Sequence, residues 1–446
     1  MASEILQTTC CVAGGGPAGM MLGYLLARKG IEVTVLEKHK DFFRDFRGDT
    51  VHPSTLEVLN ELELLKEFLD LPHEQVASLG LIVGGSEFQV ADFRHLPTTC
   101  KFVALMPQWD FLNFLSAHAK RFPSFQLLME HEATGLIGNG DRIAGIVARN
   151  GDREVEIHAD LVVGCDGRHS LTRNAAGFEV IEHGVPIDVL WFRISRRPGD
   201  PAQVLGNVNY GKALILIPRS DYFQAGLIIR KGSYQGIQAR GLEAFRSDIL
   251  KIAPYLGERV NELTDWEQIK ILRVQINRLQ RWYRPGLLCI GDAAHAMSPA
   301  GGVGINLAIQ DAVAAARILA DPLQQRNVPL AALAAVERRR TLPTRVTQAI
   351  QLAAHRGFAR IFENPGPIEP PWQLKAIVRI PGIQRVVGYA VGIGVRPEHV
   401  RSQPTAAPVR SRLSRAALAG LGIAATGAAL GWIAWKAWNR ARTTGA

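Results

Sequence analysis

Apolar residues recur with two different periods along this chain, and the first change of period predicts a strand–helix–strand unit. Residues 9–13 are a short apolar run that ends at glycines, which is typical of a buried strand. Residues 17–29 carry apolar side chains at helical spacing, and Gly30 provides the stop. Residues 32–37 form a second, valine-rich strand. This pattern predicts a parallel sheet with a right-handed crossover.

The middle of the chain predicts helices, then a β-meander, then a second block of strands. Amphipathic helices are expected at residues 55–69 and 111–121. From 126 to 163 the period becomes two, with turns at 139–141 and 150–152 and a last strand at 161–164. The second block has aromatic and β-branched strands and one helix, at 189–194, 213–217, 223–229 and 241–253.

The last part of the ordered pattern returns to a buried strand at 286–291 and a long helix at 305–320, and residues 325–395 are expected to be mostly helical. The chain therefore divides into a discontinuous nucleotide-binding domain with its C-terminal helices, a substrate domain, a linker that contains Pro404 and Pro408, and an apolar helix. These parts are predicted at residues 1–177 with 281–400, 178–280, 401–415 and 416–438. No internal repeats are visible.

Composition and charge narrow the class of protein. The chain has 446 residues, 47% of them hydrophobic, which is ample for two packed domains. Aromatic residues are only 7%, which argues against a stacking platform for nucleic acid. From Arg396 onward, eight basic residues face one acid, so the tail carries +7 of the total +10. A body near +3 with a basic tail indicates an enzyme with an attachment segment and no nucleic-acid partner.

The cysteines and the N-terminus indicate a cytoplasmic protein. The five cysteines have no zinc-ligand spacing, four of them lie in apolar strand-like runs, and no metal site is expected. The early apolar run leads into a glycine motif, so it is interpreted as a core strand and not as a secretion signal.

The first chemical motif is a glycine-rich turn between the first strand and the first helix. Gly14-Gly15-Gly16-Pro17-Ala18-Gly19 has the form G-x-G-x-x-G. Gly14 permits a tight turn, Gly16 lets the backbone approach a pyrophosphate, and Gly19 lets helix and sheet pack closely. Glu37 ends the second strand, where it can accept hydrogen bonds from a ribose. With strand, helix and acid in register, the sequence predicts a dinucleotide site.

Two further motifs follow buried strands. The segment 164–173 contains Asp166-Gly167, which taken alone is an ordinary turn. The other motif begins at Gly291-Asp292 and continues through Pro299 to Gly304 and Asn306 at a helix start. Asp292 can accept hydrogen bonds from a polyol, and the helix start can stabilise negative charge on a ring.

The three motifs, in this order, resemble the para-hydroxybenzoate hydroxylase family of FAD monooxygenases over about residues 8–400. The resemblance implies an α/β fold: a three-layer, Rossmann-like FAD-binding domain with an inserted β-sheet substrate domain. The C-terminal apolar helix is an addition to that fold. The resemblance also implies FAD and NAD(P)H as cofactors, and O₂ and an aromatic or quinone-like small molecule as substrates. Hydroxylation would proceed through a flavin C4a-hydroperoxide.

The resemblance assigns roles to individual residues. Arg47 contacts the FAD phosphates, and Gln108 contacts the flavin. Asp292 holds the ribityl chain, Pro299 lies beside the reactive edge of the flavin, and Asn306 meets a flavin carbonyl with its backbone. Asp166 lies near the pyrophosphate and takes part in NAD(P)H use. The chain departs from relatives of this type in having no thioredoxin-like domain, no halogenase W-x-W-x-I-P signature and no second G-x-G-x-x-G.

No catalytic base stands out. His52, His169 and His295 are interpreted as structural. Five side chains on or near the substrate-domain strands are candidate substrate contacts, namely Trp191, Arg193, Tyr210, Arg219 and Tyr222.

The C-terminal tail contains an apolar segment whose binding partner the sequence does not decide. Residues 416–435 are uncharged, which just meets the length needed to span a bilayer, and Trp432, Trp435 and Trp438 cluster at one end. A membrane anchor, a helix lying in the interface and a soluble partner helix all remain alternatives. A homodimer is likewise open.

Other functions fit the same motifs. A hydroxylase of a prenylated quinone precursor would explain the tail. A flavin-dependent polyprenyl reductase shares the FAD fold. A non-catalytic FAD sensor or scaffold would need only the binding motifs.

Overall fold

The computed structural model describes residues 4–43, 50–201 and 204–400. Its first sheet has eight strands in the order β19-β20-β11-β1-β2-β8, and β10 extends it from β11, with β9 outside β10. The four pairs β20–β11, β11–β1, β1–β2 and β2–β8 are parallel. The strands are β1 (Glu4–Ala13), β2 (Val33–Glu37), β8 (Phe125–Met129), β9 (Glu132–Asn139), β10 (Arg142–Asn150), β11 (Arg153–Gly164), β19 (Tyr283–Arg284) and β20 (Leu287–Cys289).

Strand β1 lies at the centre of this sheet because its second half is apolar on both faces. Cys10 and Val12 pack into the helix-side core, and Cys11 and Ala13 pack into the core under β10 and β11. The layers are therefore helices, sheet and β-meander. This confirms the predicted three-layer α/β domain and the meander, and it places the carboxyl ends of β1, β2, β11 and β20 at one edge.

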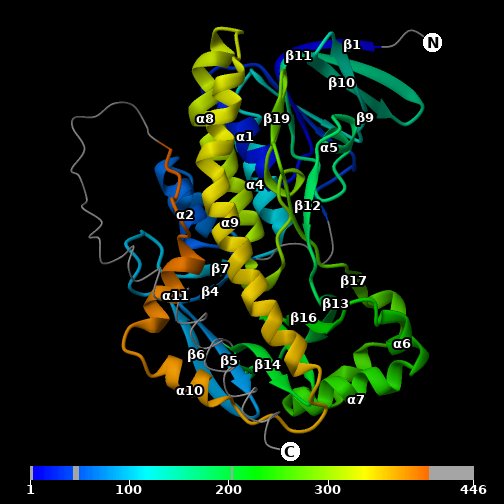
Figure 1. Ribbon diagram of the computed structural model, residues 1–446, viewed down its shortest axis with the longest axis vertical. Coiled ribbons are helices and arrows are strands. Elements are labelled where there is room, and N and C mark those ends of the chain that lie inside the picture. Colours follow the sequence, from blue (N-terminus) through cyan, green and yellow to red (C-terminus); the bar gives the residue numbers. More distant parts are fainter. Residues whose placement is uncertain (1–3, 44–49, 202–203, 401–446) are drawn as a thin grey trace, which may run out of the picture.

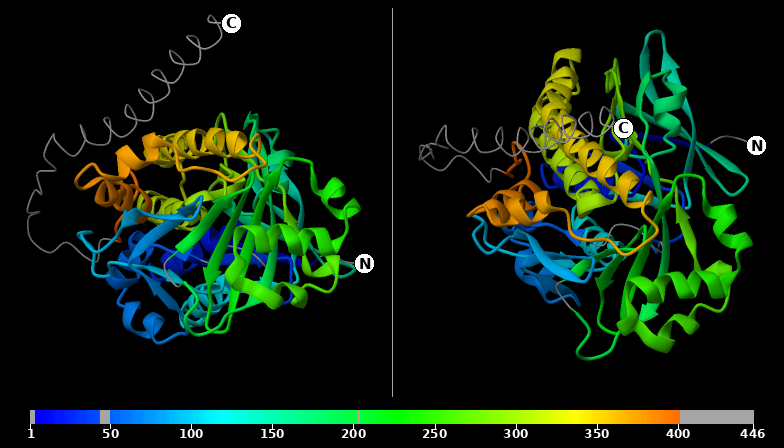
Figure 2. Two further views of the ribbon diagram at one scale, coloured as in Figure 1. Left: turned by 90° about the horizontal axis from the view of Figure 1, so that it is seen from below. Right: turned by 60° about the horizontal axis from the view of Figure 1, so that its bottom comes forward.

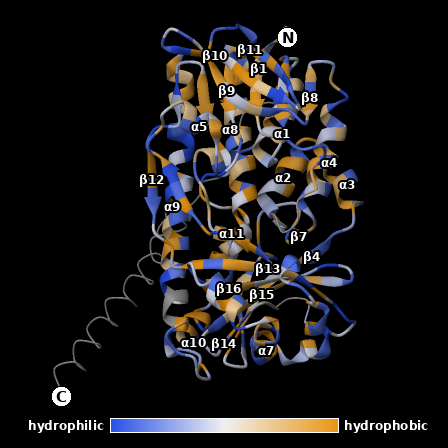
Figure 3. Cartoon of the chain, turned by 90° about the vertical axis from the view of Figure 1, so that its right-hand side faces the viewer, coloured by the Kyte–Doolittle hydropathy of each residue, from blue (hydrophilic) through white to orange (hydrophobic). Residues whose placement is uncertain are grey.

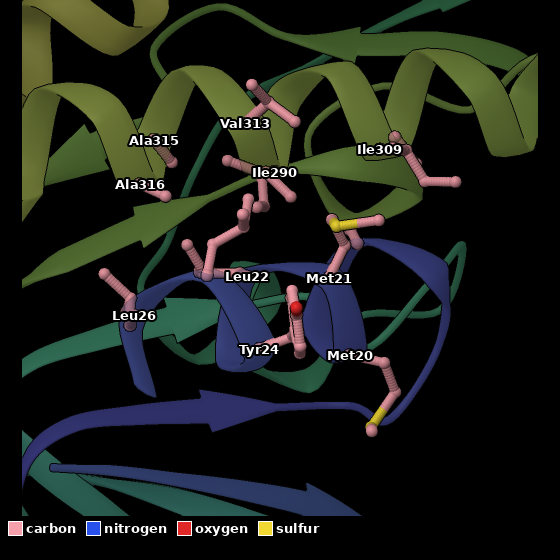
Figure 4. Packing of buried hydrophobic residues seen from close by; sticks show 14 of the residues in the cluster. Met20, Met21, Leu22, Tyr24, Leu26, Ile290, Ile309, Val313, Ala315 and Ala316 are labelled. Atoms are coloured by element: carbon pink, nitrogen blue, oxygen red, sulfur yellow. The ribbon is translucent and has the colours of Figure 1, made fainter. Parts of the chain in front are cut away.

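The helical layer is formed by α1 (Pro17–Ala27), α4 (Gln108–Ala119), α8 (Gly304–Gln324) and α9 (Leu330–Ile361). Figure 4 shows Met21 and Leu22 of α1 directed toward Ile309 and Val313 of α8. The segment Ala300–Gln324 is long and apolar enough to cross a membrane by length and composition, but 67% of its most apolar window is buried inside the protein. It is therefore explained as the core helix against which α1 and α9 pack.

The second sheet has seven strands in the order β17-β13-β16-β15-β14-β5-β6. Two of them come from residues 78–92, and the other five come from the segment 187–272. The strands are β5 (Ser78–Val83), β6 (Ser86–Asp92), β13 (Ile187–Ser195), β14 (Val204–Asn209), β15 (Lys212–Pro218), β16 (Tyr222–Arg230) and β17 (Lys270–Leu272).

One face of the second sheet packs against α7 (Leu242–Ile252), with α6 (Tyr234–Ala239) beside it, and the other face is turned toward the first domain. Alternate residues of each strand supply the two faces: Leu190 and Phe192 of β13 point to α7, whereas Val189 and Trp191 belong to the opposite cluster. Figure 3 shows apolar β13, β15 and β16 between the two parts of the molecule. We call the cluster on this inner face the interdomain cluster.

Two small sheets join the domains. One has the order β3-β7-β4, and the other pairs β12 with β18. Their strands are β3 (Thr50–Val51), β4 (Glu74–Val76), β7 (Val103–Leu105), β12 (Val180–His183) and β18 (Ile276–Leu279). The remaining helices are α2 (Pro53–Glu61), α3 (Leu65–Leu69), α5 (Leu171–Ala175), α10 (Trp372–Val378) and α11 (Ile383–Gly392), with 3₁₀ turns at Pro254–Glu262, Trp266–Gln268, Gly291–Ala293 and Ala300–Gly302.

Two local expectations differ from the structure. The single helix expected at 55–69 is two helices, α2 and α3. Glu63 lies between them with a positive φ of 62°, which interrupts the helical backbone. The strands between 74 and 105 were not expected, because short partly buried strands such as β5 lack a clean alternation. The predicted linker and apolar helix, 401–438, lie outside the described residues.

Candidate FAD-binding site

The glycine-rich loop between β1 and α1 has the geometry that its sequence requires. Gly14 has a φ of +105°, and a Cβ there would lie 2.5 Å from the carbonyl oxygen of Cys165. A Cβ on Gly19 would lie 2.0 Å from the carbonyl oxygen of Gly14. A Cβ on Gly16, in contrast, would meet no atom within 4 Å. The first and last glycines therefore allow close packing, and Gly16 borders open space.

The N-terminus of α1 faces that space. Gly16 is the N-cap, no side chain caps the helix, and Pro17 and Ala18 begin its first turn. The positive end of the helix dipole is thus available to an anion. Glu37, the buried last residue of β2, lies against the same loop, because its Oε2 would be 3.1 Å from a Cβ on Gly15. The loop and the acid predicted for ribose and pyrophosphate are therefore neighbours.

The Gly291-Asp292 turn follows β20 and meets the same helix start. Gly291 has a φ of +59°, and a Cβ there would lie 3.2 Å from Cβ of Ala18 and 3.3 Å from Cβ of Ala308. The turn therefore touches α1 in its first turn and α8 near its N-terminus. Asp292 is partly exposed, and its Oδ2 accepts a hydrogen bond from Nε of Arg168 at 3.1 Å. Arg168 was not among the residues predicted for the site.

A buried carboxylate holds this turn in place. Oδ2 of Asp311 in α8 accepts the Gly291 N–H at 3.0 Å and pairs with Nε2 of His295 at 2.6 Å, and Oδ1 accepts from Nε of Arg340 at 2.8 Å. Burial raises the pKa of Asp311, but the charges and hydrogen bonds of His295 and Arg340 outweigh it, so the pKa is below its usual value. The structural interpretation of His295 agrees with this contact. Asp311 itself was missed, although a carboxylate on the apolar face of a helix was a visible signal.

The carboxylate of Asp166 is engaged by its own loop. It accepts hydrogen bonds from Ser170 Oγ at 2.5 Å, Thr172 N–H at 2.9 Å and Thr172 Oγ1 at 2.9 Å. A Cβ on Gly14 would lie 2.9 Å from Cα of Asp166. The Asp-Gly motif therefore packs against the glycine-rich loop, and its carboxylate orients the start of α5.

The start of α8 is joined to β3. A Cβ on Gly302 would lie 2.3 Å from Oγ1 of Thr50, and that hydroxyl donates to the Gly302 carbonyl at 2.8 Å. Oδ1 of Asn306 accepts from the His52 N–H at 2.8 Å and from Thr55 Oγ1 at 2.7 Å. The Asn306 side chain is therefore used within the protein, which leaves its backbone and that of Gly304 as the groups able to meet a flavin. No side chain caps this helix, so its positive dipole end is also open to an anion.

The turn around Pro299 is anchored to α9. Ser298 N–H donates to Gln351 Oε1 at 3.0 Å, and Gln351 Nε2 donates to the carbonyls of Ser298 and Ala300. Ser298 Oγ lies 2.7 Å from Nε2 of the buried His355. Burial, assisted by the charge of Lys231, lowers the pKa of His355 to about 4, so this histidine is neutral at pH 7. Neither Gln351 nor His355 was predicted as part of this turn.

Two other predicted residues have different outcomes. Gln108 begins α4 after a two-residue connection from β7, and Leu105 of β7 is paired with Thr50. Gln108 therefore lies on the side of the molecule where β3 meets the α8 start. Arg47 lies outside the described residues.

The five candidate substrate contacts divide by exposure. Trp191 is buried in the interdomain cluster, and its Nε1 has no hydrogen-bond partner among the described residues. Arg219 is also buried. Burial raises the pKa of the Asp110 carboxyl near the start of α4, and the charge of Arg219 partly offsets that rise. Arg193 is exposed and lies over the ring of Tyr222, 5.0 Å from its centroid, and Tyr210 occupies a turn with φ +49°.

The assembled residues fit FAD. Open space at Gly16, the α1 N-terminus and the nearby Glu37 suit an adenosine diphosphate, a partly exposed Asp292 suits a polyol, and the uncapped α8 start suits an anionic ring. Burial raises the pKa of Cys165 well above its usual value, so the cysteine nearest the loop remains protonated.

Comparison with known proteins decides the family. The model of the family described as "FAD binding domain" matches residues 7–350. The 6-methylpretetramide 4-monooxygenase of Streptomyces rimosus is 32% identical over 78% of this chain and 84% of its own length. The chain belongs to the para-hydroxybenzoate hydroxylase-like FAD-dependent aromatic monooxygenases. This confirms the resemblance inferred from the motifs, and it makes the protein an FAD-dependent oxidoreductase.

Other members of the family are more distant. The chain is 26% identical to the dialkyldecalin synthase of Streptomyces rugosporus and covers 64% of it, so it spans less than two thirds of that relative. Among solved structures, P. aeruginosa PqsL superposes with a TM-score of 0.69 at 21% identity, over 80% of this chain and all of PqsL. The anhydrotetracycline hydroxylase OxyS of Streptomyces rimosus also gives 0.69, at 20% identity, over 90% of this chain and 78% of OxyS. These two likenesses show the fold of the monooxygenase.

Proposed function

We propose that this monooxygenase uses NAD(P)H and O₂ to hydroxylate an electron-rich aromatic substrate, typically a phenol, held between its two sheets. The observation that carries the proposal is the position of Trp191. Its indole is buried on the inner face of the second sheet, and Nε1 is a donor with no partner among the described residues. A buried unpaired donor is costly, and a phenolic oxygen or a carbonyl of a bound substrate would satisfy it.

A series of contacts through β7 and β3 connects Trp191 to the proposed flavin site. Trp191 shares the interdomain cluster with Val103 and Leu105 of β7. Leu105 is paired with Thr50, and Thr50 is bonded to Gly302 at the α8 start. Strands β7 and β3 thus link the interdomain cluster to the start of α8, where we propose that the flavin edge lies.

The protein's contributions to the reaction follow from these residues. Bound FAD would supply hydride acceptance and oxygen activation. The α8 N-terminus would favour the anionic reduced ring. The apolar interdomain cluster would exclude water, and the Trp191 N–H would orient the substrate oxygen.

We expect Trp191→Phe to lower kcat/KM for the aromatic substrate about two- to tenfold, because one hydrogen bond of about 0.5–1.5 kcal/mol is lost. The Kd for FAD should not change, because Trp191 lies outside the dinucleotide loops. Steady-state kinetics and FAD titration measure the two quantities. Trp266→Phe, in the 3₁₀ turn that packs against the opposite face of the same sheet, is the matched control. Equal kinetics for both variants would remove Trp191 from substrate recognition.

A hydroxylase of a prenylated quinone precursor is the second candidate, and the apolar segment 416–435 favours it. Under that proposal the protein is cytoplasmic and reaches a lipid-embedded substrate through its tail. A polyprenyl reductase would consume NAD(P)H without O₂, and a sensor would do neither.

The test is a screen of phenols and quinone precursors for compounds that stimulate NAD(P)H oxidation. Oxygen uptake is recorded in parallel, and product masses are determined by mass spectrometry. A product heavier by one oxygen atom, formed with matching oxygen uptake, is expected. NAD(P)H oxidation by any substrate without oxygen uptake would replace the proposal with a reductase.

A further inference from the structure

The surface of α10 is unusually apolar for an exposed helix. No residue of α10 is buried, and Trp372 is 71% exposed. Ile377 and Ile380 follow at 44% and 52% exposure. Trp372 begins α10, Ile377 lies in its last turn, and Ile380 follows two residues after its end, where its N–H donates to the carbonyl of Ile377. We call these three side chains the α10 patch.

The α10 patch is not needed for the fold. Leu374, inside α10, packs against the interdomain cluster, and the helix contacts β6 and α11. The helix is therefore held to the protein through Leu374, while Trp372, Ile377 and Ile380 remain exposed to solvent. Clustered exposed apolar side chains of this kind mark an interaction site.

The α10 patch is bordered by positive charge. Lys375, Arg379 and Arg385 are exposed, and no acidic residue occurs between Glu369 and Glu398. No ion pair found among the described residues involves these three cations. A surface with an indole, two isoleucines and basic neighbours has the composition of a helix that lies in a bilayer interface.

The positive charge around the α10 patch distinguishes among three possible binding partners. The tail beyond the described residues belongs to a segment that carries +7, so it would meet like charge on this surface. A second copy of the chain that docked through the same surface would bring the same cations and meet the same repulsion. An anionic lipid surface attracts the cations and accepts the apolar side chains at once.

The position of Val400, the last described residue, is consistent with a membrane partner. The N–H of Val400 donates to Glu61 of α2 at 2.5 Å, and α2, α10 and α11 lie along one side of the molecule in Figures 1 and 2. The basic, apolar tail therefore begins on the side of the molecule along which α2, α11 and α10 lie. We propose that the α10 patch docks on the surface of an anionic phospholipid bilayer, as a contact separate from the tail.

The test uses the full chain and vesicles of phosphatidylcholine, with and without phosphatidylglycerol. The variant Trp372→Ser/Ile377→Ser/Ile380→Ser should bind the anionic vesicles at least about tenfold more weakly, and Lys375→Gln/Arg379→Gln should lose most of the preference for phosphatidylglycerol. Leu330→Ser/Leu342→Ser removes two exposed apolar side chains elsewhere and should bind like the parent. Flavin absorbance and thermal midpoint should be the same for all four proteins.

A local probe separates the α10 patch from the tail. Ile380→Cys labelled with a polarity-sensitive dye should shift to the blue when anionic vesicles are added, and Leu330→Cys carrying the same dye should not. Vesicle binding without a shift at position 380 would overturn the proposal, because the tail alone would then carry the contact. Absence of binding to anionic vesicles, or a parent dimer that becomes monomeric in the serine variant, would also overturn it.

Discussion

Asp292→Ala should weaken FAD binding by about 1.5–3 kcal/mol, roughly ten- to 150-fold in Kd, while the protein remains folded. The proposed role of Asp292 is to accept a hydrogen bond from the ribityl chain, at the turn where α1 and α8 meet. Its one hydrogen bond among the described residues comes from Arg168, and both side chains are partly exposed. Water can therefore solvate Arg168 after the substitution, so the fold should tolerate the change.

Titration of FAD into apoprotein, followed by flavin fluorescence, measures this effect. Asp141→Ala, in the exposed turn after β9, should bind FAD like the parent. Arg168→Gln tests the alternative that Asp292 matters only as the partner of the arginine. If Arg168→Gln loses as much affinity as Asp292→Ala, or if Asp292→Ala binds FAD normally, Asp292 is not a ribityl ligand.

Asp311→Asn should destabilise the fold by about 3–5 kcal/mol, the usual cost of breaking a buried ion pair by removing one partner. Asp311 is completely buried and compensates the buried Arg340, with His295 and the Gly291 N–H as further partners. An asparagine of the same shape keeps the packing but leaves the Arg340 charge short of its nearest anion. The amide has one acceptor oxygen where the carboxylate has two, so it cannot accept from Arg340 and from Gly291 together. Because the Gly291 turn is then held less firmly, FAD affinity should fall together with stability.

Urea unfolding of apoprotein and FAD-loaded protein, followed by circular dichroism, gives the free energies. Asp321→Asn, three turns further along α8 and exposed, should change stability by less than about 0.5 kcal/mol. Equal unfolding midpoints for Asp311→Asn and Asp321→Asn would show that the buried pair contributes nothing.

The sequence was informative wherever function and local structure coincide. Gly14, Gly16 and Gly19 specify a turn whose geometry depends on neighbouring residues, so the strand, loop and helix start could be predicted from a short window. The same holds for the meander, whose turns contain Gly140 and Gly151 at positive φ.

Contacts between distant segments could not be predicted in this way. Asp311 acts on Gly291 and Arg340, which lie 20 and 29 residues away in the chain. Ser298 is held by Gln351 and His355 across more than 50 residues. Strands β5 and β6 join a sheet formed mainly by the distant segment 187–272, and their own hydrophobic pattern is too irregular to predict that pairing. Such pairings depend on tertiary packing, which no local period records.

The most direct test of the account is the flavin content of the purified full-length chain. FAD released by denaturation, separated by chromatography and quantified against protein, should amount to about one FAD per chain with none covalently retained. The measurement should be repeated after reconstitution with excess FAD. Protein that still holds no FAD after reconstitution would contradict the assignment of the glycine-rich loop, Asp292 and the α8 start to a flavin site.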